Sequence, residues 1–187
     1  VHLGSLGICT RLVRDVIDLG PGDVVITNHP KYGGSHLPDV NLICAVFTTE
    51  GERIAYLINR AHHAEIGGSR PGSMPPDAQN LLEEGVVIPP MYLVKRGQVL
   101  WPAIETLLKE APYPSRSVAE NIADINAALA SLRNGAEALQ KMVVHHGLEK
   151  VHFYMTEQKS AANRALWKSL VPNQNQNFQA TEQLDDG

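Results

Sequence analysis

Short runs of β-branched and aliphatic residues mark the first part of the chain, and turn residues separate them. They lie over residues 23–27, 40–48 and 53–61. Runs of this length and composition are typical of β-strands. The turn Thr49-Glu50-Gly51-Glu52 between the second and third runs predicts an antiparallel hairpin.

Apolar residues recur at helical spacing on both sides of these strands. The pattern predicts shorter helices over 1–19 and 101–110. A capping box, Ser117-Val-Ala-Glu120, begins a long helix that continues to residue 147. Another long helix follows over 148–170. Two long helices in tandem predict a helical hairpin.

The patterns together predict an α+β protein, with a small mixed or antiparallel sheet and Gly/Pro-rich site loops, followed by the long helical hairpin. We expect an α/β site-bearing region over 1–110, the hairpin over 111–172, and a linker over 173–187 that leads into a following strand region. The chain begins at Val1 without a Met and stops in a strand-and-turn pattern. We therefore expect an internal piece of a longer polypeptide.

Composition and charge narrow the classes of function. The 187 residues are 43% hydrophobic, carry a net charge of −4 and have no Lys/Arg run, which argues against a nucleic-acid partner. No signal peptide and no apolar run of membrane-spanning length is visible, so we expect no membrane partner. Cys9 and Cys44 lie far apart inside apolar patterns, which favours buried reduced thiols in a cytoplasmic protein.

The segment 28–39, NHPKYGGSHLPD, holds the densest candidate chemistry. Gly33-Gly34 permits turn conformations, while two prolines stiffen the segment. His36 and Asp39 are three residues apart, so their side chains can converge in a turn. An imidazole and a carboxylate presented together suit a divalent metal or a general-base pair. The alternative is a polar turn between two strands.

A second cluster, His62-His63-Ala64-Glu65, directly follows the predicted hairpin. The hairpin brings this cluster to the same end as His36 and Asp39. Adjacent residues of an extended segment face opposite ways, so only one of the two histidines is expected to join them. Two histidines and one carboxylate with an open position form a catalytic metal arrangement. Glu65 is a further ligand, a supporting residue or a base, and the alternative for the cluster is a polar loop.

The following segment, 66–76, is rich in Gly and Pro and carries one charge, Arg70. Such a loop can bring N–H groups and a guanidinium to an anionic substrate group, or it is an irregular crossing. The chain has no HExxH, GxxxxGK[ST] or GxGxxG motif. The HxE half of a zinc deaminase is present at residues 63–65, but the PCxxC half is missing.

The motifs NHPxxGGSHLPD and HHAEIGGSRPGSMPP, followed by a helix that ends in EEG, resemble those of the hydantoinase B/oxoprolinase family. The resemblance extends from VHLGS at Val1 to QLDDG at Gly187. The residues of these motifs are more similar to those of the oxoprolinase and hydantoinase members than to those of the acetone-type carboxylases. The B chain of the family is much longer than this sequence, which agrees with an internal piece.

The resemblance implies an ATP-dependent enzyme that hydrolyses a cyclic amide such as 5-oxoproline or a hydantoin. A hydantoinase A-type partner would use ATP to activate the substrate, in a hetero-oligomer with this B part. It also implies a divalent metal, Mn, Zn or Fe, held by His36, Asp39 and His62, with His63 as the rival of His62. We predict His63 and Glu65 as catalytic residues.

Three further residues of the same motifs, Asn28, Arg70 and Ser73, are predicted substrate contacts. Relatives mostly read HHAD where this chain has Ala64-Glu65, so the longer acid departs from the family pattern. Two other functions remain open: a subunit of an acetone/acetophenone-type carboxylase, and an assembly module without catalysis. The substrate itself is not specified by the sequence.

Overall fold

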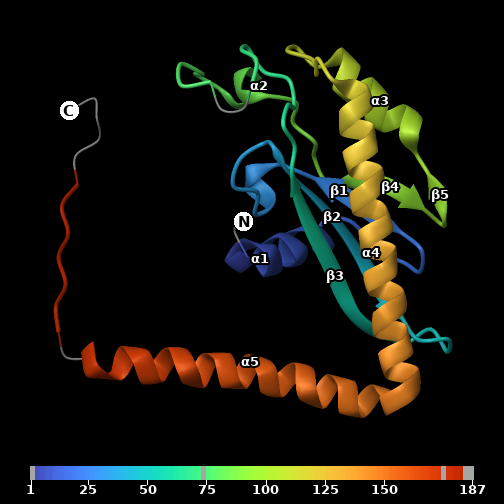
Figure 1. Ribbon diagram of the computed structural model, residues 1–187, viewed down its shortest axis with the longest axis vertical. Coiled ribbons are helices and arrows are strands. Elements are labelled where there is room, and N and C mark those ends of the chain that lie inside the picture. Colours follow the sequence, from blue (N-terminus) through green and yellow to red (C-terminus); the bar gives the residue numbers. More distant parts are fainter. Residues whose placement is uncertain (1–2, 73–74, 174–175, 183–187) are drawn as a thin grey trace. The chain divides into compact units, whose positions relative to one another are not determined.

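A five-stranded antiparallel sheet forms the centre of the computed structural model, which describes residues 3–72, 75–173 and 176–182 (Figure 1). The strands are β1 (Val24–Thr27), β2 (Asp39–Phe47), β3 (Arg53–His62), β4 (Met91–Lys95) and β5 (Gln98–Val99). Their order is β3-β2-β1-β4-β5, and each neighbouring pair is antiparallel. This arrangement confirms the predicted α+β class and the predicted hairpin of β2 and β3.

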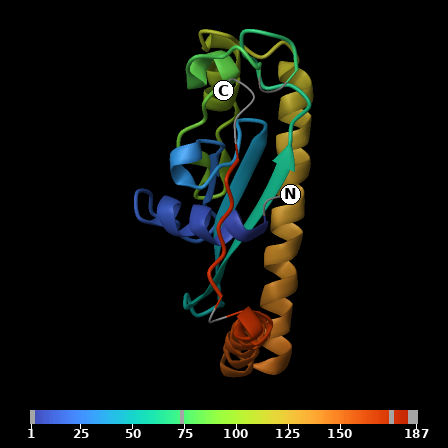
Figure 2. The same cartoon turned by 90° about the vertical axis from the view of Figure 1, so that its left-hand side faces the viewer.

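Helices cover both faces of the sheet, with α1 (Leu3–Arg14) on one side and α4 (Val118–His146) on the other (Figure 2). Alternate residues of a strand face opposite sides. Ile43 and Ala45 of β2 therefore share a core cluster with Cys9 and Val13 of α1. On the other face, the Asn59 side chain of β3 donates a 2.7 Å hydrogen bond to a backbone carbonyl of α4. Double coverage explains why nearly every residue of β2 is buried.

Two of the remaining helices, α3 (Trp101–Glu110) and α5 (Leu148–Leu170), match the predicted spans 101–110 and 148–170. The other three are short and are η1 (Pro30–Tyr32), α2 (Leu81–Glu84) and η2 (Val171–Asn173). Helices α4 and α5 are the two long helices that the apolar spacing predicts. Among the described helices, none combines the length and the apolar character that crossing a bilayer requires.

Contacts divide the chain into two compact units, Val1–His145 and His146–Gly187. The first unit contains the sheet and nearly all of α4. The prediction grouped α4 with α5 in a region over 111–172, whereas the side chains of α4 pack on the sheet. Buried Ile125, Leu129 and Leu132 provide the apolar stripe for that packing.

Candidate metal centre

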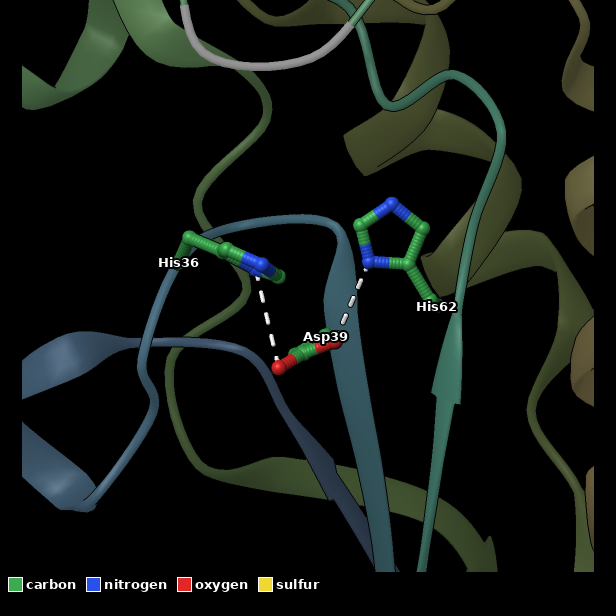
Figure 3. Close-up of side chains that lie close together, drawn as sticks. All are labelled: His36, Asp39 and His62. Atoms are coloured by element: carbon green, nitrogen blue, oxygen red, sulfur yellow. Dashed lines mark hydrogen bonds and ion pairs between the residues drawn. The ribbon is translucent and has the colours of Figure 1, made fainter. Parts of the chain in front are cut away.

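Asp39 and His62 meet at the open end of the β2–β3 hairpin. Asp39 is the first residue of β2, His62 is the last residue of β3, and the two are direct partners in the antiparallel ladder. The Oδ1 atom of Asp39 lies 3.2 Å from Nδ1 of His62 (Figure 3). Cross-strand partners have neighbouring side chains on one face, so the register itself creates this contact.

His36 joins the pair through a tight turn. The backbone N–H of Asp39 donates a 3.1 Å hydrogen bond to the carbonyl of His36, which folds the segment back on itself. Nδ1 of His36 then lies 3.6 Å from Oδ2 of Asp39, and the rings of His36 and His62 are 5.0 Å apart. One ligand atom from each of the three residues falls within 4.8 Å of the others. Figure 3 shows both imidazoles beside the carboxylate.

Burial differs sharply among the three side chains. Asp39 is 6% exposed, His36 is 20% exposed and His62 is 53% exposed. The Oδ2 atom of Asp39 is buried and accepts no hydrogen bond from the described residues. A buried carboxylate oxygen without a donor is costly, and a cation would compensate it. Two imidazole nitrogens and one carboxylate oxygen also match the donor preference of Zn²⁺, Mn²⁺ and Fe²⁺ sites.

The loop before β2 is shaped by two glycines that approach other backbone segments closely. Gly33 has φ +83°, and a Cβ there would lie 2.8 Å from the backbone N of Cys9 in α1. A Cβ on Gly34 would lie 2.6 Å from the carbonyl oxygen of Asn28. The loop that carries His36 therefore packs against the backbone of α1 and against the backbone at Asn28, where the loop begins. Only glycine, which lacks a Cβ, permits both approaches.

Asn28 is fully buried and fastens the start of this loop to the segment before β4. Its Nδ2 donates to the carbonyls of Leu37 and Val86, both at 2.8 Å, and its Oδ1 accepts from the N–H of Ile88 at 2.7 Å. Both amide hydrogens are thus used inside the protein. This geometry makes Asn28 a crosslink between segments, and its predicted role as a substrate contact stays a prediction.

His63 lies on the opposite face of the chain from His62, as expected for adjacent residues of an extended segment. It is 1% exposed, and its Nδ1 lies 2.5 Å from Oδ1 of Asn121 in α4. The backbone N–H of His63 donates to the carbonyl of Pro38 at 2.8 Å. The structure therefore brings His62, and not its rival His63, to Asp39. The catalytic role of His63 stays a prediction.

Glu65 hydrogen-bonds to the segment that leads into α4. Its carboxylate accepts hydrogen bonds from Ser115 Oγ at 2.8 Å and from the backbone N–H groups of Gly67, Arg116 and Ser117 at 2.5, 3.1 and 3.3 Å. Burial alone raises the pKa of Glu65, but these hydrogen bonds outweigh it and hold the pKa below its usual value. An acceptor with this many donors anchors the segment before α4, and the predicted catalytic role of Glu65 stays a prediction.

The two remaining predicted substrate contacts lie in the Gly/Pro-rich loop. The guanidinium of Arg70 is largely exposed and forms a 2.6 Å ion pair with Asp77. This pair closes the loop on itself, and the substrate role of Arg70 stays a prediction. Ser73 lies outside the described residues.

Sequence reasoning missed Arg60, whose guanidinium is buried beside the three-residue cluster. Arg60 NH1 lies 3.9 Å from Oδ2 of Asp39, and its side chain is 2% exposed. The signal was present in the sequence, because Arg60 precedes His62 by two residues in a strand. Residues two apart in a strand share one face.

The loop, the hairpin end and the cluster correspond to the motifs that the sequence shares with one family. A family model described as hydantoinase B/oxoprolinase matches residues 1–187. The chain belongs to the hydantoinase B/oxoprolinase family. The motifs read from the sequence led to the same assignment.

Curated relatives in this family are much longer than the present chain. The 5-oxoprolinase of Saccharomyces cerevisiae is 37% identical over 199 residues, which cover 100% of this chain and 16% of that protein. Caprolactamase subunit beta of Pseudomonas jessenii is 32% identical over 166 residues, covering 88% of this chain and 28% of that subunit. The chain thus spans about a sixth of the length of the yeast relative.

Solved structures show the same fold. The crystal structure of the ATP-dependent caprolactamase from Pseudomonas jessenii superposes with a TM-score of 0.79 and 30% identity, over 90% of this chain and 29% of that one. A nucleotide-free acetone carboxylase gives a TM-score of 0.65 at 17% identity, over 80% of this chain and 20% of that one. At that identity the second likeness speaks for the fold alone.

Proposed function

We propose that this chain carries the metal centre of an ATP-dependent cyclic-amide hydrolase of the 5-oxoprolinase or N-methylhydantoinase type. The observation that carries the proposal is the convergence of His36, Asp39 and His62 on one point, with the oxygen of a buried carboxylate lacking a donor. The relatives named 5-oxoprolinase and caprolactamase support the choice of reaction class.

The three side chains divide the work of holding a divalent metal. Asp39 is the most buried of the three and contributes a negative charge, while His36 and His62 supply nitrogen ligands from two different segments. The strong exposure of His62 leaves the outer side of the cluster accessible to a substrate carbonyl. When bound, Mn²⁺, Zn²⁺ or Fe²⁺ would supply Lewis-acid polarisation of an acyl group during ring opening.

The proposal includes a partner and a substrate class. The printed name of the Pseudomonas jessenii relative is that of one subunit, and the solved enzyme is described as ATP-dependent. By analogy, a hydantoinase A-type subunit or domain would use ATP to activate 5-oxoproline or a hydantoin in a hetero-oligomer with this chain. Cys9 and Cys44 are buried free thiols, which agrees with the reducing cytoplasm as the site of the reaction.

Metal analysis of the purified chain tests the proposal, with His36→Ala and Asp39→Ala beside wild type. Near-stoichiometric Mn, Zn or Fe in wild type, lost in both variants with the circular dichroism unchanged, is the expected result. His145→Ala, on α4 outside the cluster, is the matched control and should retain the metal. A wild-type chain that binds no metal after supplementation would overturn the metal-centred mechanism.

A further inference from the structure

The guanidinium of Arg60 ties together the segments that surround the cluster. Its Nε donates to Asn41 Oδ1 at 2.7 Å, and its NH1 donates to Ser5 Oγ at 2.8 Å and to Ser35 Oγ at 3.3 Å. Its NH2 donates to the carbonyl of Gly33 at 3.1 Å. One planar group therefore joins α1, the loop that carries His36, and β2.

The orientation of this group is itself controlled from the sheet. Asn41 is fully buried, and its Nδ2 donates to the carbonyls of Thr27 and Asp39, both at 3.1 Å. Those two bonds turn Oδ1 of Asn41 towards Arg60, its partner in the β2–β3 ladder. The side chain of Arg60 consequently has little freedom to move.

The distance from Arg60 to Asp39 has a chemical consequence. At 3.9 Å from Oδ2, NH1 is too far for a hydrogen bond but close enough for charge attraction. The arginine thus attracts the buried carboxylate by charge but does not satisfy Oδ2 with a hydrogen bond, since its N–H groups donate to neutral acceptors. Oδ2 of Asp39 therefore remains available as a ligand atom, while Oδ1 lies 3.2 Å from Nδ1 of His62.

We infer that Arg60 is a positioning residue of the metal centre, which fixes the His36 loop against α1 and leaves Oδ2 of Asp39 open to a metal. The inference deepens the proposed function and rests on it, because a metal at His36, Asp39 and His62 is its premise. Residues that support ligands from outside typically contribute about 10–100-fold in metal affinity.

Arg60→Lys is the informative variant because it keeps the charge and removes the planar fork. A lysine cannot bridge Asn41, Ser5 and Gly33 together, and its flexible ammonium can reach Asp39 directly and compete with a metal. Affinities for Zn²⁺ and Mn²⁺, titrated separately against a chelating indicator, should fall about 10–100-fold. The double variant Ser5→Ala/Ser35→Ala, which leaves Arg60 in place, should show a smaller loss in the same direction.

Two controls separate positioning from general stability. Arg53→Lys changes an exposed arginine of the same strand and should leave both affinities unchanged. Ile104→Val, at a buried position of α3, lowers the stability of the fold and should also leave both affinities unchanged. Wild-type affinity in Arg60→Lys, or an equal loss in Ile104→Val, would overturn this inference alone. A wild-type chain without metal affinity would overturn the proposed function together with it.

Discussion

Asp39 and His62 are direct cross-strand partners, and Asp39 Oδ1 lies 3.2 Å from His62 Nδ1. Strand register, and not a loop, positions the pair, so the hydrogen-bonded sheet restricts the movement of both residues. A shift of register by one residue would turn His62 to the opposite face and replace it with a neighbour. The hairpin therefore decides which of the two adjacent histidines meets Asp39.

Asp39→Asn tests the contribution of the carboxylate charge. The amide keeps the shape of Asp39 but loses its charge, so metal affinity should fall by more than the roughly 10–100-fold typical of supporting residues. Titration of Zn²⁺ against a chelating indicator measures the loss. His29→Gln, in the same loop but outside the cluster, is the control and should bind like wild type. Equal affinity in Asp39→Asn and wild type would contradict the assignment of Asp39 as a ligand.

Gly33→Ala and Gly51→Ala together separate backbone strain from close packing. Both glycines have positive φ, +83° and +87°, but only a Cβ on Gly33 meets neighbouring atoms, at 2.8 Å from the N of Cys9. Alanine at Gly51 should therefore cost about 1–2 kcal/mol from left-handed strain alone.

At Gly33 a further ~1–3 kcal/mol is expected, because the loop must move away from α1. Urea unfolding of the two variants measures the difference. Since the displaced loop carries His36, Gly33→Ala should also weaken metal binding, whereas Gly51→Ala should not. Equal destabilisation in the two variants would show that the contact with Cys9 contributes nothing.

The sequence predicted the cluster well because its geometry depends on local rules. Three-residue spacing in a turn joined His36 to Asp39, and hairpin pairing joined both to His62. The alternation of a strand explained why His62 and His63 separate. Each of these rules acts over neighbours in the chain or over one hairpin.

The roles of Glu65 and Asn28 could not be predicted in the same way. The partners of Glu65 at residues 115–117 lie about fifty positions further along the chain, and the partners of Asn28 include residues 86 and 88. Both residues lie in segments with the candidate metal ligands, so the sequence alone favours a catalytic or substrate-binding role for them. In the folded chain these two residues also join segments that are distant in the sequence, which no local spacing reveals.

Asn28→Ala tests whether this residue is a crosslink. The variant leaves the N–H of Ile88 and two buried carbonyls without partners, and each unsatisfied buried group costs about 1–3 kcal/mol. We expect the free energy of unfolding to fall by about 2–5 kcal/mol in urea titrations. Asn126→Ala, at an exposed position of α4, should change it by less than about 0.5 kcal/mol. Unchanged stability with lost activity would instead restore Asn28 as a substrate contact.

Glu65→Gln tests the anchor at the start of α4 through its dependence on pH. The glutamine keeps the size of the side chain but replaces one carboxylate oxygen by an NH₂ group and removes the negative charge. The carboxylate of Glu65 accepts hydrogen bonds from Ser115 and three backbone N–H groups. At neutral pH the loss should cost about 1.5–3 kcal/mol of unfolding free energy, the range for hydrogen bonds to a charged group. Glu137→Gln, which removes an exposed, solvent-screened pair with Lys141, should change the unfolding free energy much less than Glu65→Gln does.

The sign of the pH effect follows from the lowered pKa of Glu65 in the folded state. A carboxyl group with a lowered folded pKa contributes its full stabilisation above its unfolded pKa, about 4.3 for glutamate. That contribution disappears as pH falls through the folded pKa. Urea unfolding between about pH 3 and 7 should therefore show a constant gap between wild type and Glu65→Gln above about pH 5, narrowing in acid. A gap that widens in acid would mean that Glu65 is protonated when it contacts the segment before α4, which would contradict an anchor formed by its carboxylate.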